Sequence, residues 1–290
     1  DPRGNSPQIS IDAGKIIRYL ILKNNTALIV HRINECDERK GTKRMNSLLK
    51  NSNFFSDHTV FIASWLKHLN LWNRNNHYSV ILNGGDKKIF NKKKNKRWDK
   101  RKPIKLITHH WGGNELKGMD VYKKFDKVLD EPYWKNKIDF TYVGNIPGNQ
   151  VFKNIKHIKP ISGQKLSDVI SSHNIYITAS INEPGGMHHI EGGLCGLPIL
   201  YRESGSLTEY CKGYGVSFKN VNDVLFSLEK LITDYDYYYS RISNYNRTSD
   251  LMCKEYYKLF KDLLKSKNKI LQKRDFYSNP WRLLRTQILI

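Results

Sequence analysis

Residues 175–200 read IYITASINEPGGMHHIEGGLCGLPIL and contain, in order, a strand pattern, a glycine-rich turn, a helix pattern and a second strand pattern. The first run, Ile175–Thr178, is apolar and mostly β-branched, which is typical of a buried strand. The helical segment 187–195 follows and ends at the stop signals Gly196 and Pro198. A strand, a covering helix and a further strand form the repeating unit of a parallel sheet, so this stretch predicts an α/β fold.

The same alternation continues along most of the chain. Short runs rich in β-branched or aromatic residues indicate buried strands, and amphipathic stretches with helical spacing lie between them. Further strands are predicted at 27–30, 60–63, 104–107, 140–143 and 198–200, and helices at 117–129, 165–172, 236–271 and 281–290. These elements together predict parallel sheets covered by helices.

A lysine-rich segment divides the chain into two parts. Residues 91–102 contain almost no apolar side chains and cannot support a core, and turn signals at 83–86 and Pro103 flank them. Few strands precede this loop and the chain starts at Asp1, so the first domain is expected to be incomplete. The predicted parts are a partial N-terminal domain (1–83), a crossover and basic loop (84–103), a complete C-terminal domain (104–270) and a C-terminal helix returning toward the first domain (271–290).

The net charge points to an anionic partner. Lys and Arg number 49 against 27 Asp and Glu, giving +22, while a hydrophobic content of 39% excludes a wholly disordered polycation. Most of the excess lies in residues 87–105 and 254–285, and such concentrated charge attracts phosphates, anionic lipid or nucleic acid. The segment 87–105 has only Phe90 and Trp98 as stacking residues, so a nucleic-acid-binding module is the weaker alternative.

Cysteine usage and hydropathy indicate a compartment. Four cysteines occur without a CxxC pair, which fits a reducing environment, and no apolar run reaches the roughly 18 residues of a membrane-spanning helix. We therefore expect a cytoplasmic protein. The basic segments add the expectation of peripheral contact with an anionic membrane, and simple accumulation of Lys and Asn in exposed loops is the alternative.

Two carboxylates frame the glycine-rich turn of the opening stretch. Glu183 precedes Gly185 and Gly186, and Glu191 follows one turn into the helix. Ligands of α/β sheets bind at the carboxyl edge of the strands, where glycines allow close approach and helix N–H groups favour an anion. The turn could grip sugar hydroxyls and phosphate, or it could be a loop with two solvated glutamates. A metal site at His188-His189 is less favoured, because adjacent helical residues point about 100° apart.

The residues around this turn resemble a known family. Glu183 to Glu191 is similar to the E-x7-E motif of retaining GT-B glycosyltransferases, in particular glycosyltransferase family 4 (group 1), in the form EPxG followed by ExxxCGLP. Gly205-Ser206 with Glu209 resembles the family's GG-x-x-E segment. Residues 80–90 resemble its crossover into the second domain, and residues 108–118, ending in Lys117-Gly118, resemble the first loop of its C-terminal domain.

The resemblance implies two Rossmann-like domains facing a cleft and a retaining, hexosyltransferase-type enzyme. It would move a sugar from a nucleotide-diphosphate sugar to a glycan or lipid-linked acceptor, with no cofactor and no metal. Glu183 would contact the donor sugar as a catalytic residue, Lys117 would neutralise the diphosphate as an electrostatic catalyst, and Glu191 would bind the ribose. The donor-binding residues implied are Asn114, Lys117, Gly185, Gly186, Met187, His188 and Glu191.

The resemblance also extends to the N-terminal part, and it fails at one position. The family often has a histidine at the edge of its first domain, so His31 is a catalytic candidate and Arg32 an acceptor-side contact. The family usually has an arginine five or six residues before Lys117, where Trp111 and Gly112 stand here. His109, His110 or Asn114 could compensate, and a non-catalytic transferase-like protein stays open as an alternative.

Overall fold

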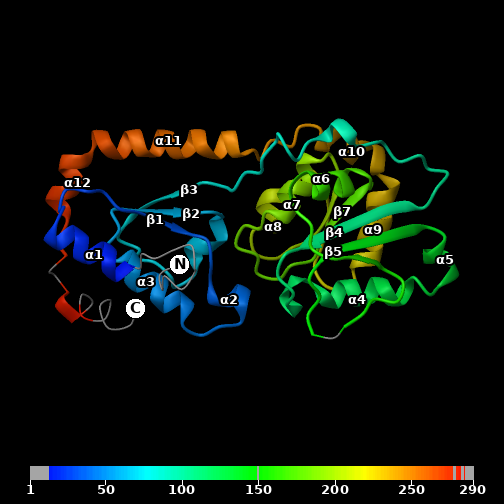
Figure 1. Cartoon of the computed structure of the whole chain (residues 1–290), viewed down its shortest axis with the longest axis horizontal. Coiled ribbons are helices and arrows are strands. Elements are labelled where there is room, and N and C mark those ends of the chain that lie inside the picture. Colours follow the sequence, from blue (N-terminus) through cyan, green and yellow to red (C-terminus); the bar gives the residue numbers. More distant parts are fainter. Residues whose placement is uncertain (1–12, 149, 277–278, 282–283, 285–290) are drawn as a thin grey trace. The chain divides into compact units, whose positions relative to one another are not determined.

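The structure is a computed structural model, and it describes all residues except 1–12, 149, 277–278, 282–283 and 285–290. Contacts divide it into two compact units. Unit 1 comprises the described parts of residues 1–82 and 253–290, and unit 2 comprises those of 83–252. Each unit contains one parallel sheet with helices packed against it (Figure 1), which confirms the predicted α/β class with two Rossmann-like domains.

The sheet of unit 1 is small. It has three parallel strands in the order β1-β2-β3, and all four residues of the central strand β2 are buried. The strands are β1 (Val30–Ile33), β2 (His58–Phe61) and β3 (His77–Val80); the helices of this unit are α1 (Ala13–Leu22), α2 (Asp37–Lys40), α3 (Met45–Asn53), the 3₁₀ helix η1 (Ser64–His68), most of α11 (Ser249–Lys265), and α12 (Lys267–Lys273).

Strand β1 begins later than the sequence pattern predicts. Its ladder with β2 starts at Val30, paired with His58, because the groups just before it are bonded elsewhere. The Ile29 N–H donates to the Asp57 carboxylate at 2.7 Å, and the Arg274 guanidinium donates to the Ala27 carbonyl at 2.8 Å. The predicted bounds of this strand, 27–30, are therefore wrong. The candidate catalytic residue His31 and the acceptor-side candidate Arg32 lie within the strand and not after its end.

The sheet of unit 2 has six parallel strands in the order β6-β5-β4-β7-β8-β9. The chain starts at β4 in the middle, runs outward through β5 and β6, and then returns to place β7 on the other side of β4. The direction of winding therefore reverses between β4 and β7, which makes the carboxyl ends of these two strands the expected ligand site. The strands are β4 (Ile104–His110), β5 (Ile138–Gly144), β6 (Lys156–Ile158), β7 (Ile175–Thr178), β8 (Ile199–Arg202) and β9 (Gly215–Phe218).

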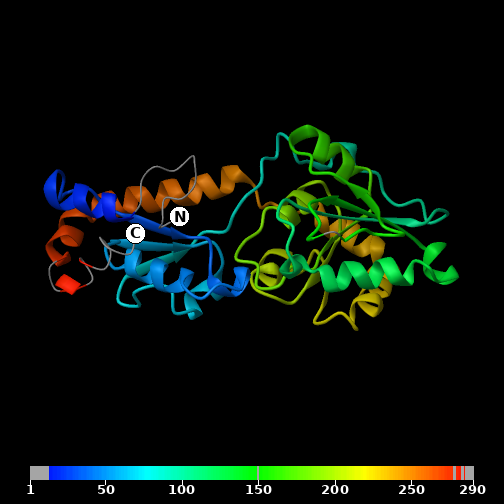
Figure 2. The same cartoon turned by 60° about the horizontal axis from the view of Figure 1, so that its bottom comes forward.

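Helices cover both faces of this sheet (Figure 2). Helices α4 and α9 share one large apolar core with the strands, and α7 packs on β7. The helices of unit 2 are η2 (Lys92–Lys94), η3 (Glu115–Lys117), α4 (Met119–Val128), α5 (Pro132–Lys135), α6 (Gly163–Ser171), α7 (His188–Leu194), α8 (Leu207–Cys211), α9 (Val224–Thr233) and α10 (Tyr235–Ile242).

The C-terminal part differs from its predicted layout. The single helix expected at 236–271 is three helices, α10, α11 and α12, with breaks at 243–248 and at Ser266. The division between the units also differs from the predicted boundaries, because residues 84–103 belong to unit 2 and 253–270 to unit 1. Helix α11 thus starts in unit 2 and continues into unit 1. The helix predicted at 281–290 falls mostly outside the described residues.

The lysine-rich segment is a strap bound to the surface of unit 2. Residues 87–102, hereafter the basic strap, contain only the short helix η2 and are otherwise irregular. Four of their ten cations pair with carboxylates of α6, α10 and α11. The pairs are Lys87–Asp250, Lys94–Asp168, Arg97–Asp236 and Lys100–Asp236. The strap therefore has a defined path even though it lacks a core of its own.

The described part of the chain holds no helix that is both long and apolar enough to cross a bilayer.

Candidate functional site

The loops that follow β4 and β7 meet at the reversal point of the unit 2 sheet. The first contains η3 and the second contains the glycine-rich turn quoted above. They are joined directly, since the Ile181 N–H donates to the Leu116 carbonyl at 2.8 Å. Gly118 allows this approach: its φ is +93°, and a methyl group there would lie 2.4 Å from the Ala179 Cβ. The sheet topology thus brings two of the motifs from the sequence to one place.

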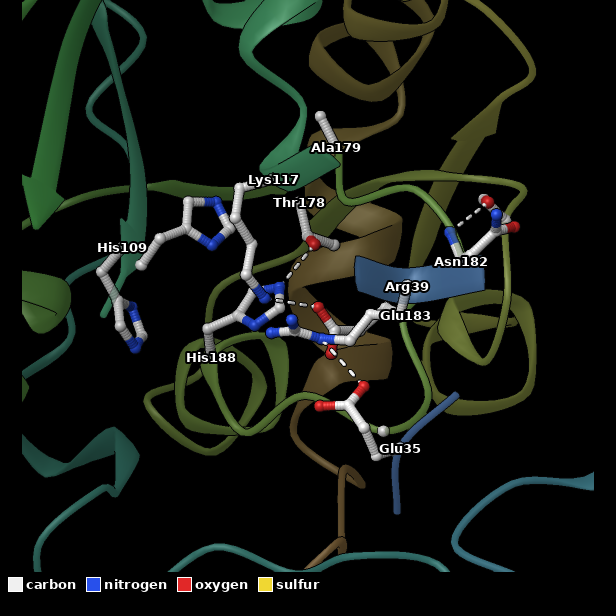
Figure 3. A network of polar contacts seen from close by, with 12 residues as sticks. Glu35, Arg39, His109, Lys117, Thr178, Ala179, Asn182, Glu183 and His188 are labelled. Atoms are coloured by element: carbon white, nitrogen blue, oxygen red, sulfur yellow. Dashed lines mark hydrogen bonds and ion pairs between the residues drawn. The ribbon is translucent and has the colours of Figure 1, made fainter. Parts of the chain in front are cut away.

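A buried ion pair lies between these loops. The Lys117 Nζ donates to the Glu183 Oε2 at 2.7 Å (Figure 3), and both side chains are less than a tenth exposed. Ions so far from water are costly unless each has a partner, and here each charge is compensated by the other. An ammonium has three protons, so Lys117 can keep this bond and still donate to a further anion.

The backbone around Glu183 is fixed by the segment that follows β8. The Glu183 carbonyl accepts from the Ser206 N–H at 2.8 Å, and Asn182 before it has a positive φ of 52°. The Asn182 N–H donates to the Ser204 hydroxyl at 2.8 Å. Gly205, with φ +58°, has no room for a side chain, since a methyl group would lie 2.5 Å from the Glu183 carbonyl oxygen. The segment after β8, which includes the residues that resemble GG-x-x-E, therefore fixes the backbone that carries the Glu183 carboxylate.

A hydrogen-bonded chain holds the second glutamate. The His109 Nε2 lies 2.7 Å from the Glu191 Oε2, and the His109 Nδ1 lies 3.0 Å from the Tyr176 hydroxyl. That hydroxyl accepts the backbone N–H of His109 and has its own proton left to donate to Nδ1. Burial raises the pKa of Tyr176 well above its ordinary value, so the proton stays on the phenol. With Nδ1 as the acceptor of the phenol proton, the His109 Nε2 donates to Glu191.

The two histidines that start α7 are neutral. Burial, followed by the cations and imidazoles around it, lowers the pKa of His188 well below its ordinary value, and burial lowers that of His189 to about 4. The His188 Nε2 bonds to the Thr178 hydroxyl at 2.8 Å (Figure 3). Neither ring nitrogen of His189 has a hydrogen-bond partner. Within the described residues, no three His, Cys, Asp or Glu side chains gather as a metal site would require.

The other donor-side residues from the sequence lie in the same two loops. Asn114 opens η3, where its carbonyl accepts from the Lys117 N–H at 3.1 Å, and its side-chain oxygen is buried without a partner. Gly186 packs against the His188 ring so closely that a methyl group would lie 2.6 Å from it. Met187 is the exposed residue directly before α7.

Two supporting residues, Asn83 and Tyr176, are not among the site residues that the sequence predicts. Asn83, in the crossover motif, is buried; its side chain donates to the Gly185 carbonyl at 2.6 Å, and its N–H donates to the Tyr210 hydroxyl at 2.7 Å. Tyr176 lies inside a strand and fixes His109 as described. Asn83 could have been found, because it lies in the crossover motif at residues 80–90. Tyr176 could not, because no sequence pattern around it marks its role, which depends on the pairing of β4 with β7.

His31 and Arg32 lie in unit 1, on β1, and both line a cavity of about 480 Å³. The Asn53 Nδ2 donates to the His31 Nδ1 at 3.1 Å. The orientation of this amide is fixed because its oxygen accepts the Asn73 N–H at 2.8 Å. Burial lowers the pKa of His31 to about 4, so the ring is neutral and its proton is on Nε2. His31 thus has a proton on Nε2 that it can donate at neutral pH.

Comparison with known proteins identifies the fold. Protein-family models and curated proteins give no match. Among solved structures, HepE of Anabaena in complex with UDP superposes with a TM-score of 0.66 at 12% identity, over 85% of this chain and 75% of that one. Sucrose-phosphate synthase from Thermosynechococcus elongatus gives 0.63 at 14%, over 82% and 68%. The chain has the GT-B glycosyltransferase fold.

A further GT-B neighbour is the pneumococcal O-GlcNAc transferase GtfA in complex with UDP and GlcNAc, with a TM-score of 0.60 at 14% identity. The match covers 86% of this chain but only 55% of GtfA. At such identities the likeness shows the fold alone. The GT-B architecture predicted from the motifs is confirmed. The reaction has to be inferred from the residues of the site.

Proposed function

We propose that the chain is a retaining glycosyltransferase of the family 4 type, which transfers a sugar from a nucleotide-diphosphate sugar to a glycan or lipid-linked acceptor. The observation that carries the proposal is the buried Lys117–Glu183 pair at the reversal point of the unit 2 sheet. Support also comes from the neighbours with this fold, whose structures contain UDP, UDP-glucose or UDP-2-fluoro glucose.

The donor would bind across the two loops of unit 2. Lys117 would donate its remaining protons to the diphosphate, and Asn114 and the backbone of residues 185–188 would add polar contacts. Glu191, held by His109, would accept hydrogen bonds from the ribose hydroxyls. Glu183 would accept from hydroxyls of the sugar. Trp111 and Gly112 replace the family's usual arginine, so Lys117 would be the main cation on the phosphates in this loop.

The chemical step would rely on charge stabilisation of the leaving diphosphate. As the bond from the anomeric carbon to phosphate oxygen breaks, negative charge grows on the phosphate, and an ammonium already in place stabilises it without reorganisation. In a retaining reaction of this type the acceptor hydroxyl attacks from the face that the diphosphate leaves, and its proton passes to the departing phosphate. His31, whose proton is on Nε2, would donate to the sugar or the acceptor and would not act as a base.

A nucleotide-binding panel tests the donor assignment. UDP, GDP, ADP and CDP are titrated calorimetrically into the protein and into the variant Lys117→Met, with Lys127→Met on the exposed side of α4 as the control. One diphosphate should bind, and Lys117→Met should weaken it at least tenfold, since a charge-assisted contact to phosphate contributes about 1.5–3 kcal/mol. Equal affinities of Lys117→Met and the unmodified protein for every diphosphate would remove Lys117 from the site.

A further inference from the structure

Helix α11 carries a row of lysines along its exposed side. Lys254, Lys258, Lys261 and Lys265 are spaced by four, three and four residues, which places them on one face of a helix. All four are exposed. No ion pair joins any of them to a carboxylate of the described residues. Glu255 and Asp262 of the same helix are also exposed, so residues 253–265 carry 4 − 2 = +2, and the lysine row keeps a positive excess without ion-pair partners.

The opposite side of α11 packs against unit 1. Met252, Tyr256, Leu259 and Leu263 follow the same helical spacing and are half-buried. Leu259 and Leu263 line a cavity together with residues of β2 and β3, which fixes the side of the helix that faces the sheet. Figures 1 and 2 show α11 running beside that sheet. The lysine row therefore points away from the unit.

An apolar strip runs next to the lysine row. Tyr257, Phe260 and Leu264 are 64%, 45% and 63% exposed, and they continue one flank of the helix together with Cys253. The Lys261 Nζ lies 5.1 Å from the centre of the Tyr257 ring, so the charged and apolar rows are in contact. Large apolar side chains in a line beside lysines are the pattern of helices that lie in a membrane interface.

The basic strap of unit 2 offers a contrast within the same chain. Four of its ten cations, Lys87, Lys94, Arg97 and Lys100, are paired with carboxylates of the protein, whereas none of the four lysines of the α11 row is. The strap also lacks a parallel apolar row, since the Phe90 side chain is buried. Of the two basic segments found in the sequence, the C-terminal one is thus better suited to a surface partner.

We propose that the exposed side of α11, formed by the four lysines with Tyr257, Phe260 and Leu264, docks the protein on an anionic phospholipid bilayer. Lysines attract the negative surface, and the apolar strip enters the boundary between head groups and acyl chains. A nucleic-acid partner fits less well, because Leu264 offers no stacking face. The surface lies outside the proposed nucleotide-sugar site. Membrane binding can therefore be tested separately from the proposed reaction, and failure of one proposal does not imply failure of the other.

Vesicle sedimentation tests the proposal. The protein should bind vesicles of phosphatidylcholine with 30% phosphatidylglycerol and not vesicles of phosphatidylcholine alone. The variant Lys258→Glu/Lys261→Glu should bind the anionic vesicles at least about tenfold more weakly, since each lysine near such a surface contributes about 1 kcal/mol. The matched control, Lys92→Glu/Lys93→Glu in the strap, makes the same charge change and should have a much smaller effect. Leu264→Ser should weaken binding severalfold without any change of charge.

The exposed Cys253 gives a second readout that needs no lysine variant. Cys36, Cys195 and Cys211 are buried, so an environment-sensitive thiol dye labels Cys253 on the apolar flank of α11. Its emission should shift to shorter wavelength with anionic vesicles and stay unchanged with neutral ones. The proposal is overturned if the dye does not respond, if the strap variant loses as much binding as the α11 variant, or if a single-stranded RNA binds more tightly than the vesicles and displaces them.

Discussion

At the residue scale, the opposite charges of Lys117 and Glu183 stabilise each other in the buried part of the site. Because both side chains are buried, removal of one partner takes a close opposite charge away from a buried ion, which costs more than the pair itself contributes. We expect Lys117→Met to lower the free energy of unfolding of unit 2 by about 3 kcal/mol. The double variant Lys117→Met/Glu183→Gln should recover most of this loss, because no charge is left buried.

Urea unfolding followed by circular dichroism measures the two effects. The double variant should regain stability without regaining nucleotide affinity, which separates the structural role of the pair from its binding role. A double variant that is less stable than Lys117→Met would contradict the assignment of the loss to the charge that Glu183 keeps after Lys117 is removed.

A second prediction at this scale concerns His189 and pH. Its pKa is about 4 in the folded protein and about 6.5 when exposed, so between these values the unfolded chain binds more protons. The free energy of unfolding therefore falls as the pH falls from 6.5 toward 4. The free energy of unfolding decreases between pH 7 and pH 5, and His189→Phe should make this decrease smaller by about 2 kcal/mol. Neither ring nitrogen is bonded, so the substitution sacrifices no hydrogen bond.

The check is a comparison of urea midpoints at pH 7 and pH 5 for both proteins. The unmodified chain should lose more stability than the variant. Parallel losses in the two proteins would mean that His189 is not buried as a neutral ring.

At the element scale, the contact between α7 and β7 sets the position of Glu191. A methyl group at Gly192 would lie 2.3 Å from the Tyr176 ring, and Tyr176 in turn holds His109. Gly192→Ala should therefore destabilise unit 2 by about 2 kcal/mol through overpacking and should also weaken nucleotide binding. Gly112→Ala, where a methyl group would meet only an atom at 3.9 Å, is the control and should leave the unfolding midpoint unchanged. Equal midpoints for the two variants would refute the close packing of α7 on β7.

Ion pairs with Asp236 are expected to hold the basic strap on the surface of unit 2. Asp236 accepts from both Arg97 and Lys100, and these bonds hold the pKa of its carboxyl below the ordinary range. Asp236→Asn should speed trypsin cleavage after Lys100 and Arg101 severalfold, because the strap then leaves the surface more often. Limited digestion with mass spectrometry measures this, with Asp234→Asn as the control. Identical cleavage rates in all three proteins would show that the ion pairs do not restrain the strap.

Local sequence patterns predicted some strands and helices correctly and others wrongly. The apolar run 175–178 matches β7, since a fully buried strand of a parallel sheet is recognisable from hydropathy alone. The start of β1 was predicted wrongly because the deciding bonds come from Asp57 and Arg274, far away in sequence. The single helix predicted at 236–271 missed the break at 243–248, where polar residues interrupt an otherwise helical pattern.

At the scale of the whole molecule, the sequence predicted the fold better than the site. The order of motifs was enough for the GT-B fold, and the structure adds that the loops after β4 and β7 meet where the sheet reverses. The partnerships of His109 with Glu191 and of Lys117 with Glu183 could not be read from spacing, because each joins two residues more than 60 positions apart in the chain.

The most direct test of the central claim is sugar release from a nucleotide sugar, followed by proton NMR, with the unmodified protein and Glu183→Gln. The unmodified protein should hydrolyse one donor of a panel of UDP- and GDP-sugars slowly, and the sugar should first appear in the anomeric configuration it had in the donor. Glu183→Gln should be at least about a hundredfold slower, as expected when a group that contacts the reacting sugar is lost. Equal rates for both proteins, or no release above buffer from any donor, would contradict the central claim.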